Sequence, residues 1–423
     1  MQQRRRTMDE VSLPLAPRLL NLWGDTLARV GLTPKPLDAQ GLRRTAEAAT
    51  GLDDRGEAVR FDPLLDHLLE SAASEARLTP FGRAFLQQDC VSVLSHQLLA
   101  RELFRRHPEA LEFPVRRPLF IVGFFRSGTT LLQRILGGNH HARSLRTWES
   151  LRPISEEFSA RGKGGDQRVE AAERDIRTLR RFVLPRVHLL DAHAPEESLF
   201  LLRHTFSSLV QWALFGGDSF LRRLLDQDTR PVYEYLRSLL RALQWQAPGG
   251  RWILKTGQHL LDLDVIAEVF PDAGFIWTHR DPGELVPSFL SIAACFRRGT
   301  QARPVDLPHL AENSLEVIDA ALTRGMESKV VRQGERILHV PYTRLVEDPI
   351  GTATRIAERF DLPVDDDAQR RMRSWKTANP RDRWGRHRYG LEGFGLDGAD
   401  VTRRYAEYTS RFLAPGGESE GPA

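Results

Sequence analysis

Residues 118–136, PLFIVGFFRSGTTLLQRIL, contain the strongest structural signal in this chain of 423 residues. The apolar run at residues 119–122 ends at Gly123, a pattern typical of a buried parallel strand that leads into a turn. Residues 130–136 predict a helix that follows at once and ends at a Gly-Gly pair. In such a unit, backbone N–H groups and the positive end of the helix dipole converge on one point, which suits an anion. Residues 123–130 are therefore a candidate phosphate-binding loop, named here the phosphate loop.

The phosphate loop lacks one residue that nucleotide-hydrolysing loops carry. Gly123 and Gly128 have the glycine spacing of a Walker A motif, but Thr129 stands where that motif has its lysine. Without this lysine the loop is poorly suited to a γ-phosphate and its Mg²⁺. Arg126 lies within the turn instead, and its guanidinium can bind two phosphate or sulfate oxygens at once. The alternative is an ordinary strand–turn–helix unit with a solvated arginine.

Predicted strands and helices alternate along the rest of the chain. Three more apolar runs predict buried strands, at residues 252–254, 275–277 and 337–340. Apolar residues recur at helical spacing over residues 89–104. The pattern indicates a three-layer, P-loop-like α/β core with a parallel sheet. We expect a helical N-terminal region (1–117), an α/β domain (118–413) with a helical insertion (about 154–243), and a flexible tail (414–423).

The composition is that of a folded globular protein with a weak positive charge. Hydrophobic residues make up 41% and charged residues 27% of the chain, and the formal net charge is +4. This excess suits a small anionic ligand but is too small to indicate nucleic acid. Two cysteines exclude a disulfide scaffold and a four-cysteine zinc site. No apolar run reaches the length of a membrane span or follows the basic start as in a secretory signal, so we expect a cytoplasmic protein.

The segment at residues 118–136 resembles the 5′-phosphosulfate loop of sulfotransferases that use 3′-phosphoadenosine 5′-phosphosulfate (PAPS). It is most similar to the bacterial and Golgi-type branch of that family, in which arginine replaces the loop lysine of the cytosolic enzymes. The resemblance implies the fold and activity of these enzymes. It also implies that the phosphosulfate is bound by Arg126, Ser127, Gly128, Thr129 and Thr130.

A second stretch, residues 275–289 (FIWTHRDPGELVPSF), resembles the 3′-phosphate motif of the same family. In that motif an arginine closes a strand and a serine follows eight residues later, and Arg280 and Ser288 have this spacing. A guanidinium and a hydroxyl can hold the ribose 3′-phosphate, a contact that distinguishes PAPS from ordinary nucleotides. The alternative is that Asp281 only begins a helix and pairs with Arg280.

Two further segments resemble parts of the nucleotide site. Residues 337–349 (ILHVPYTRLVEDP) look like the family's strand that ends beside the adenine, which would place Tyr342 there; core packing is its alternative role. Residues 383–396 (RWGRHRYGLEGFGL) resemble the segment that closes over the nucleotide, so Arg386 and Arg388 are candidates for contacting the 3′-phosphate. A basic surface turn would have the same pattern.

Sulfuryl transfer needs a cation near the developing charge and a base for the acceptor proton. Lys255 ends an apolar run, and its strand WILKT resembles the strand whose lysine contacts the sulfuryl group in cytosolic sulfotransferases; a surface lysine is the alternative. For the base, Glu149 lies 23 residues after Arg126, an offset comparable to that of the catalytic glutamate in Golgi-type enzymes. His259 follows Lys255 by four residues, whereas the cytosolic motif has a spacing of two. The other candidates are His193, Glu196 and Glu197.

The resemblance implies a PAPS-dependent sulfotransferase that acts on a hydroxyl or, as a second choice, an amine of a small-molecule, lipid or glycan-like acceptor. The second product would be 3′-phosphoadenosine 5′-phosphate (PAP). We expect no metal, because no grouping in the sequence has metal-ligand spacing, and we interpret His140 and His141 as loop residues. Two alternatives remain open: a P-loop nucleotide kinase or NTPase, and a non-catalytic adenine-nucleotide-binding protein of the same fold.

Overall fold

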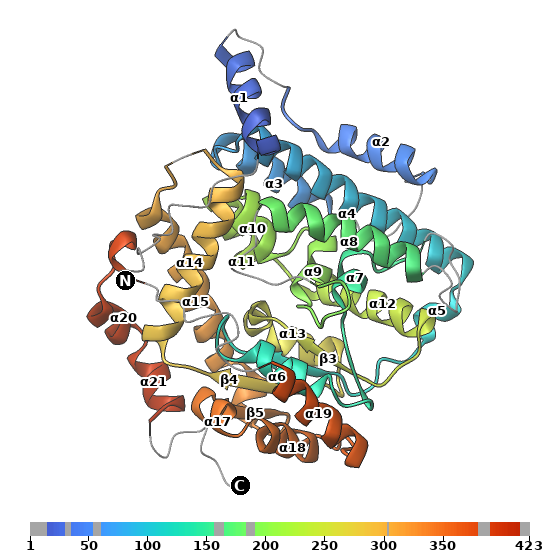
Figure 1. The fold of residues 1–423 in the computed structure, drawn as a ribbon, viewed down its shortest axis with the longest axis vertical. Helices are drawn as coiled ribbons and strands as arrows, with labels where there is room; N and C mark the ends of the chain where they lie inside the picture. Colours follow the sequence, from blue (N-terminus) through green and yellow to red (C-terminus); the bar gives the residue numbers. More distant parts are fainter. Residues whose placement is uncertain are drawn as a thin grey trace.

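The computed structural model describes residues 15–29, 35–53, 61–155, 165–182, 191–302, 304–379 and 390–414. Its centre is a five-stranded sheet in which all neighbouring strands are parallel and the strand order is β2-β3-β1-β4-β5. The strands are β1 (Leu119–Val122), β2 (Ala142–Ser144), β3 (Arg251–Lys255), β4 (Gly274–His279) and β5 (Ile337–Pro341). Helices cover both faces of this sheet (Figure 1), which confirms the predicted α/β core.

The central strand β1 shows why short apolar runs form this sheet. Leu119 and Ile121 pack into the core on one face, and Phe120 and Val122 pack into the core on the other. A strand that is buried on both faces needs an unbroken apolar run. The sequence predicts β1, β3, β4 and β5 to within two residues of each end, but it does not predict β2, a half-buried edge strand of three residues.

The smaller core lies between the sheet and helices that appear at the bottom of Figure 1. α6 (Thr129–Leu136) follows the phosphate loop directly and contacts α18 (Pro349–Arg359) and α19 (Asp366–Ala378). α17 (Tyr342–Glu347) begins where β5 ends. The helix predicted at residues 130–136 is confirmed.

The larger core lies on the opposite face and continues into the helical regions. The N-terminal helices are α1 (Leu15–Arg29), α2 (Ala39–Thr50), α3 (Asp62–Ser74), α4 (Pro80–Arg106) and α5 (Glu109–Glu112). Between β2 and β3 lie α7 (Thr147–Leu151), α8 (Gly165–Phe182), α9 (Leu199–Leu202), η2 (Arg203–Thr205), α10 (Leu209–Phe215), α11 (Asp218–Asp226) and α12 (Arg230–Gln246). After β3 and β4 come η3 (Gly257–Leu261), α13 (Leu263–Val269), α14 (Pro282–Thr300), α15 (Leu307–Glu327) and α16 (Lys329–Gln333). The chain continues beyond α19 with η4 (Glu392–Phe394), α20 (Gly398–Arg404) and α21 (Ala406–Phe412).

The N-terminal helices share this larger core with the sheet. It contains Leu65 of α3, Leu94 of α4 and Phe120 of β1, so packing is continuous across the boundary expected at residue 117. The helix predicted at residues 89–104 lies within α4. Residues 1–14 and all but the first residue of the expected tail lie outside the described residues.

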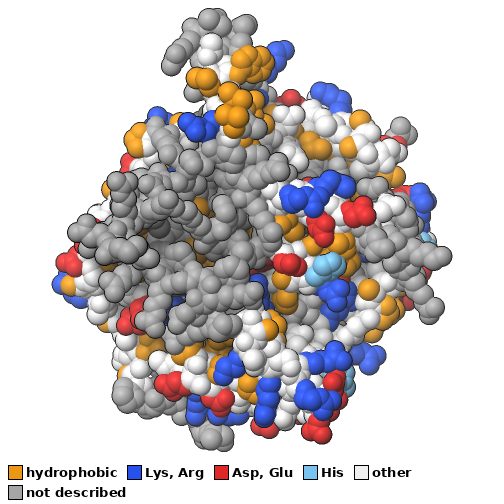
Figure 2. Space-filling model, viewed as in Figure 1, with side chains coloured by type: hydrophobic (Ala, Val, Ile, Leu, Met, Phe, Trp, Pro, Cys, Tyr) orange, Lys and Arg blue, Asp and Glu red, His pale blue; other side chains and the backbone are white. Residues whose placement is uncertain are grey.

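Helix α1 projects from the rest of the molecule (Figure 1), and hydrophobic side chains gather on it (Figure 2). Its Leu15, Leu22 and Trp23 are 70%, 64% and 66% exposed. Within the described ranges, no helix is both long enough and apolar enough to cross a membrane.

Candidate active site

The carboxyl ends of β1, β3, β4 and β5 lie at one edge of the sheet. Each of these strands has a predicted site residue at its last position or directly after it. β1 leads into the phosphate loop and Lys255 ends β3, while Arg280 and Tyr342 come directly after β4 and β5. Ligands bind at this edge in open α/β sheets, because the loops gather there. The fold therefore brings together residues from distant parts of the chain.

The phosphate loop is held in a tight turn that includes three residues with positive φ: Gly123 (130°), Arg126 (73°) and Gly128 (91°). Glycine is required at the first position, because a Cβ atom on Gly123 would lie 2.4 Å from Oγ1 of Thr278. The buried Ser127 hydroxyl donates a hydrogen bond to the Phe124 carbonyl at 2.6 Å and lies 2.7 Å from Thr278 Oγ1. These contacts connect the turn to β4.

Arg280 lies against the phosphate loop. Its Nη1 donates a hydrogen bond to the Arg126 carbonyl at 2.7 Å, and its Nε donates to Oε2 of Glu284 at 2.8 Å. The guanidinium carbon is 4.3 Å from the centre of the Tyr342 ring, a cation–π distance. The pairing with Asp281 that the sequence left open is not formed, because that carboxylate accepts a hydrogen bond from the Gly283 N–H and caps α14.

A cavity of about 880 Å³ opens beside the phosphate loop. Its polar end includes Arg126, Thr130, Glu197, Arg280 and Tyr342. Its other walls are mainly aromatic and aliphatic and come from α4, α9, α10 and α14, with Phe81, Phe85, Phe200, Val210, Phe289 and Ile292. A volume of this size can enclose a small organic molecule.

Lys255 forms a nearly buried ion pair with Glu197 behind the polar end. Its Nζ lies 2.6 Å from Oε1 of Glu197 and donates to Oγ1 of Thr130 at 3.2 Å, and the lysine side chain is 2% exposed. This burial excludes the alternative of a surface lysine. The Ser198 N–H donates to the Lys255 carbonyl at 3.0 Å, which fixes the Glu197 segment to the end of β3. The other carboxylate oxygen of Glu197, Oε2, is buried and has no hydrogen-bond partner among the described residues.

Ser288 lies on α14 and is 3% exposed. Within the part of the chain that the structure describes, its hydroxyl has no hydrogen-bond partner. Leaving a buried polar group unpaired costs about 1–3 kcal/mol, so this hydroxyl would gain from a hydrogen-bond partner. Ser288 does not form part of the cavity wall. The other predicted 3′-phosphate contacts, Arg386 and Arg388, lie outside the described residues.

Glu149 lies away from the cavity wall and is 3% exposed. One carboxylate oxygen accepts a hydrogen bond from Nη2 of Arg143 at 2.7 Å, and the other accepts from the Arg146 N–H at 2.9 Å. The second contact caps the first turn of α7. The Arg143 guanidinium also stacks on Trp252 of β3 at 4.2 Å. Because both oxygens are engaged in this buried framework, the structure does not bring Glu149 to the residues at the polar end.

His259 is also held inside the framework. Its Nε2 lies 2.8 Å from the Ser198 hydroxyl and its Nδ1 lies 3.0 Å from the Tyr233 hydroxyl. Burial lowers the pKa of His259 from 6.5 to about 3, so the ring is neutral at pH 7. His259 does not line the cavity, and its contact with Ser198 supports the segment that carries Glu197.

Of the three remaining candidates for the base, only Glu197 lines the cavity. His193 is exposed, and its N–H donates to Asp191. Glu196 is 3% exposed, and its Oε1 accepts a hydrogen bond from the Glu197 N–H at 2.8 Å. Glu196 therefore positions the backbone of its neighbour.

The sequence analysis missed a polar group on the far wall of the cavity. Asp89 of α4 pairs with Arg203 of η2 and accepts a hydrogen bond from Nε2 of Gln211 at 3.3 Å. All three side chains line the cavity. They lie on separate helices, and Asp89 is 114 and 122 residues from its two partners, so no local motif marks them.

Comparisons with a protein-family model and with solved structures agree with the fold described above. A model described as the sulfotransferase family matches residues 118–366, and the chain belongs to that family. Sulfotransferase STF9 from Mycobacterium avium is 28% identical with a TM-score of 0.80, and the match covers 90% of this chain and 98% of that one. Sulfotransferase STF1 from Mycobacterium tuberculosis H37Rv is 26% identical with a TM-score of 0.75, over 88% and 99% of the two chains. No curated protein matches the sequence. The resemblance seen in the sequence is thus confirmed at the level of family and fold.

Proposed function

We propose that this sulfotransferase uses PAPS and transfers the sulfuryl group to a hydroxyl of an acceptor with an apolar body. The observation that carries the proposal is the Lys255–Glu197 ion pair, in which the buried Lys255 contacts Glu197 and Thr130, two residues that line the polar end of the cavity. It brings a cation and a carboxylate to the point where the phosphate loop would present a phosphosulfate. Sulfuryl transfer needs both groups.

In this proposal PAPS lies along the carboxyl edge of the sheet. The backbone N–H groups of residues 128–130 and the Arg126 guanidinium bind the 5′-phosphosulfate. Arg280 and Ser288 bind the 3′-phosphate, and Tyr342 contacts the adenine. The unpaired Ser288 hydroxyl and the contact of Arg280 with the loop backbone support this assignment.

The acceptor hydroxyl oxygen attacks the sulfur atom and forms a new S–O bond, while the S–O bond to the 5′-phosphate breaks and PAP leaves. Glu197 takes the acceptor proton, and Lys255 stabilises the charge that develops on the bridging oxygen. Before PAPS binds, Lys255 is neutralised by Glu197. An incoming phosphosulfate competes for the lysine and thereby frees the carboxylate to act as the base.

The walls of the cavity favour a lipid or an apolar small molecule over a glycan-like acceptor. Burial of apolar surface against aromatic and aliphatic side chains is worth roughly 25 cal/mol per Å². A glycan would need partners for many hydroxyl groups, and buried polar groups without partners are unfavourable. The Asp89–Arg203–Gln211 group and the Arg152–Asp175 ion pair also line the cavity, and either can contact a polar substituent of the acceptor.

Ligand-induced stabilisation tests the nucleotide part of the proposal. We expect PAP to raise the melting temperature strongly and AMP to raise it little, because a ligand that binds only the native state stabilises it. Arg280→Ala should abolish the preference for PAP over AMP. Arg344→Ala removes an exposed arginine close by and is the matched control. Stabilisation by ATP and Mg²⁺ alone would instead support the kinase alternative.

Transfer of labelled sulfate from PAPS tests the catalytic part. We expect long-chain alcohols or apolar phenols to accept sulfate in preference to sugars. A protein that binds PAP but sulfates none of the alcohols, amines and sugars offered would favour the non-catalytic nucleotide-binding alternative.

A further inference from the structure

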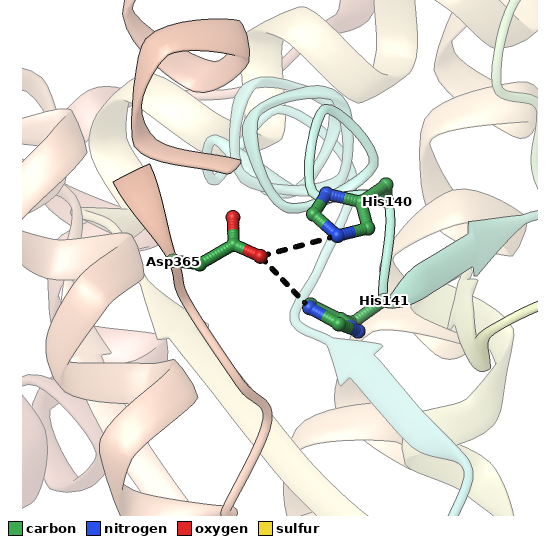
Figure 3. Close-up of side chains that lie close together, drawn as sticks. All are labelled: His140, His141 and Asp365. Atoms are coloured by element: carbon green, nitrogen blue, oxygen red, sulfur yellow. Dashed lines mark hydrogen bonds and ion pairs between the residues drawn. The ribbon is translucent and has the colours of Figure 1, made fainter. Parts of the chain in front are cut away.

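A cluster of two histidines and an aspartate lies outside the candidate active site, between the loop after α6 and the start of α19. Figure 3 shows both imidazole rings directed toward one oxygen of Asp365. Nε2 of His140 and Nε2 of His141 each lie 3.3 Å from Oδ2 of Asp365. The three side chains offer ligand atoms that all lie within 4.8 Å of one another. We propose that His140, His141 and Asp365 bind a divalent transition-metal ion, with Zn²⁺ as the best match.

The two distances to Asp365 suit a shared metal ion, and the His141 contact at 3.3 Å is a long hydrogen bond in the absence of an ion. Charge-assisted N–H···O bonds are usually about 2.7–2.9 Å long. Ligands that lie about 2.0–2.1 Å from a tetrahedral Zn²⁺ are about 3.4 Å apart. Nitrogen and carboxylate ligands suit Zn²⁺ and its neighbours in the first transition row, whereas Mg²⁺ and Ca²⁺ prefer oxygen ligands.

The surrounding contacts hold the cluster in place without the ion. The other oxygen of Asp365, Oδ1, accepts a hydrogen bond from the Ala368 N–H at 2.8 Å and caps α19, which leaves Oδ2 for the histidines. Asn139 accepts a hydrogen bond from the His141 N–H at 2.9 Å, and its Nδ2 donates to the Pro363 carbonyl at 2.7 Å. Such outer contacts orient metal ligands and strengthen binding.

Solvent access also suits a cation. His140, His141 and Asp365 are 36%, 38% and 51% exposed, so an ion can enter and water can complete its coordination. The nearby Asp367 has Oδ2 3.6 Å from Nδ1 of His140. Its carboxylate is paired with Arg370 and Arg371.

The proposed ion would connect two elements that shape the cavity. The histidines follow α6, the helix that continues from the phosphate loop, and Asp365 caps α19. Trp375, Lys376 and Asn379 at the far end of α19 line the cavity. The ion therefore fixes a wall of the cavity and takes no part in sulfuryl transfer, so this proposal does not depend on the proposed function.

Calorimetric titration of the full chain with Zn²⁺ tests the site, after removal of any affinity tag and treatment with a chelator. We expect one Zn²⁺ per chain and a rise in melting temperature with Zn²⁺ concentration. His141→Gln and Asp365→Asn should each weaken binding about tenfold or more, and asparagine still caps the helix. His67→Gln on α3 is the control and should bind Zn²⁺ like the parent protein.

Two results would overturn the site. One is a parent protein that binds no Zn²⁺, and the other is equal Zn²⁺ affinity in the parent and the His141→Gln/Asp365→Asn double variant. Far-ultraviolet circular dichroism and cooperative thermal unfolding of each variant show independently that it is folded. Visible absorption of the Co²⁺-loaded parent provides a second measurement, because it reports the nitrogen and oxygen ligands of the ion.

Discussion

The two ends of the cavity are built from the chain in different ways. At the polar end, the phosphate loop, Lys255, Arg280 and Tyr342 each stand at or directly after the end of a parallel strand. At the other end, the wall is assembled from α4, α9, α10 and α14, whose side chains meet only through helix packing. A parallel sheet places its carboxyl ends together by construction, so the polar end depends on local sequence, whereas the apolar end depends on how the helices pack.

Glu197 lines the polar end of the cavity, and its replacement has the largest expected effect. Glu197→Gln removes the proposed base and should lower kcat by about 10²- to 10⁴-fold, while PAP-induced stabilisation remains. The measurement is the rate of sulfate transfer from PAPS under saturating acceptor.

Glu149→Gln is the matched control for this prediction. Its carboxylate pairs with Arg143 away from the cavity, so the variant should lose stability and keep most of its kcat. If Glu149→Gln lost as much kcat as Glu197→Gln while remaining folded, the base would have to be sought at Glu149.

A charge placed in the apolar wall should weaken acceptor binding, and this effect should be smaller than the loss of kcat in Glu197→Gln. Ile292 of α14 lines the cavity. Ile292→Asp should raise the KM for an apolar acceptor by about 10- to 150-fold, equivalent to about 1–3 kcal/mol, and should reduce PAP-induced stabilisation much less than Arg280→Ala does. Ile292→Val keeps the wall apolar and should change KM little. Weakened PAP binding with an unchanged acceptor KM would contradict this division of the cavity.

Acid should destabilise the helices that form the apolar end of the cavity. The buried His96 of α4 should contribute the smallest of these effects. Burial lowers the pKa of His96 from 6.5 to about 3. Between pH 6.5 and pH 3, His96 binds a proton in the unfolded chain but not in the native protein. The contribution of His96 to the free energy of unfolding is therefore complete above pH 6.5 and is lost as the pH falls toward 3. His96→Gln should reduce the slope of unfolding free energy against pH in this window by up to about 1.4 kcal/mol per pH unit.

Denaturant unfolding at several pH values measures this slope. His67→Gln on α3 should keep the slope of the parent protein. An unchanged slope in His96→Gln would show that His96 is not a source of the acid sensitivity.

The sequence analysis succeeded where a signal is local. Four strands, the helix after the phosphate loop and the family follow from apolar runs and two short motifs. It missed β2 because three residues of mixed polarity at a sheet edge leave no apolar run. The offset along the chain made Glu149 a candidate base, but an offset does not report which carboxylate faces the cavity, and among the candidates Glu197 does. His140 and His141 lie in the loop between α6 and β2, as predicted, but no local signal shows that they contact Asp365, which lies more than 220 residues away.

By itself, the sequence determined four apolar strands of the core, the phosphate loop and the spacing of Arg280 and Ser288, because each is set by a short stretch of chain. Only the tertiary structure decided that Lys255 pairs with Glu197, 58 residues away, and that Glu149 is held by Arg143. It also decided the apolar walls and the histidine–aspartate cluster. These features arise from segments that meet when helices pack on the sheet, and the free energy of that packing depends on the whole core rather than on any short stretch of chain.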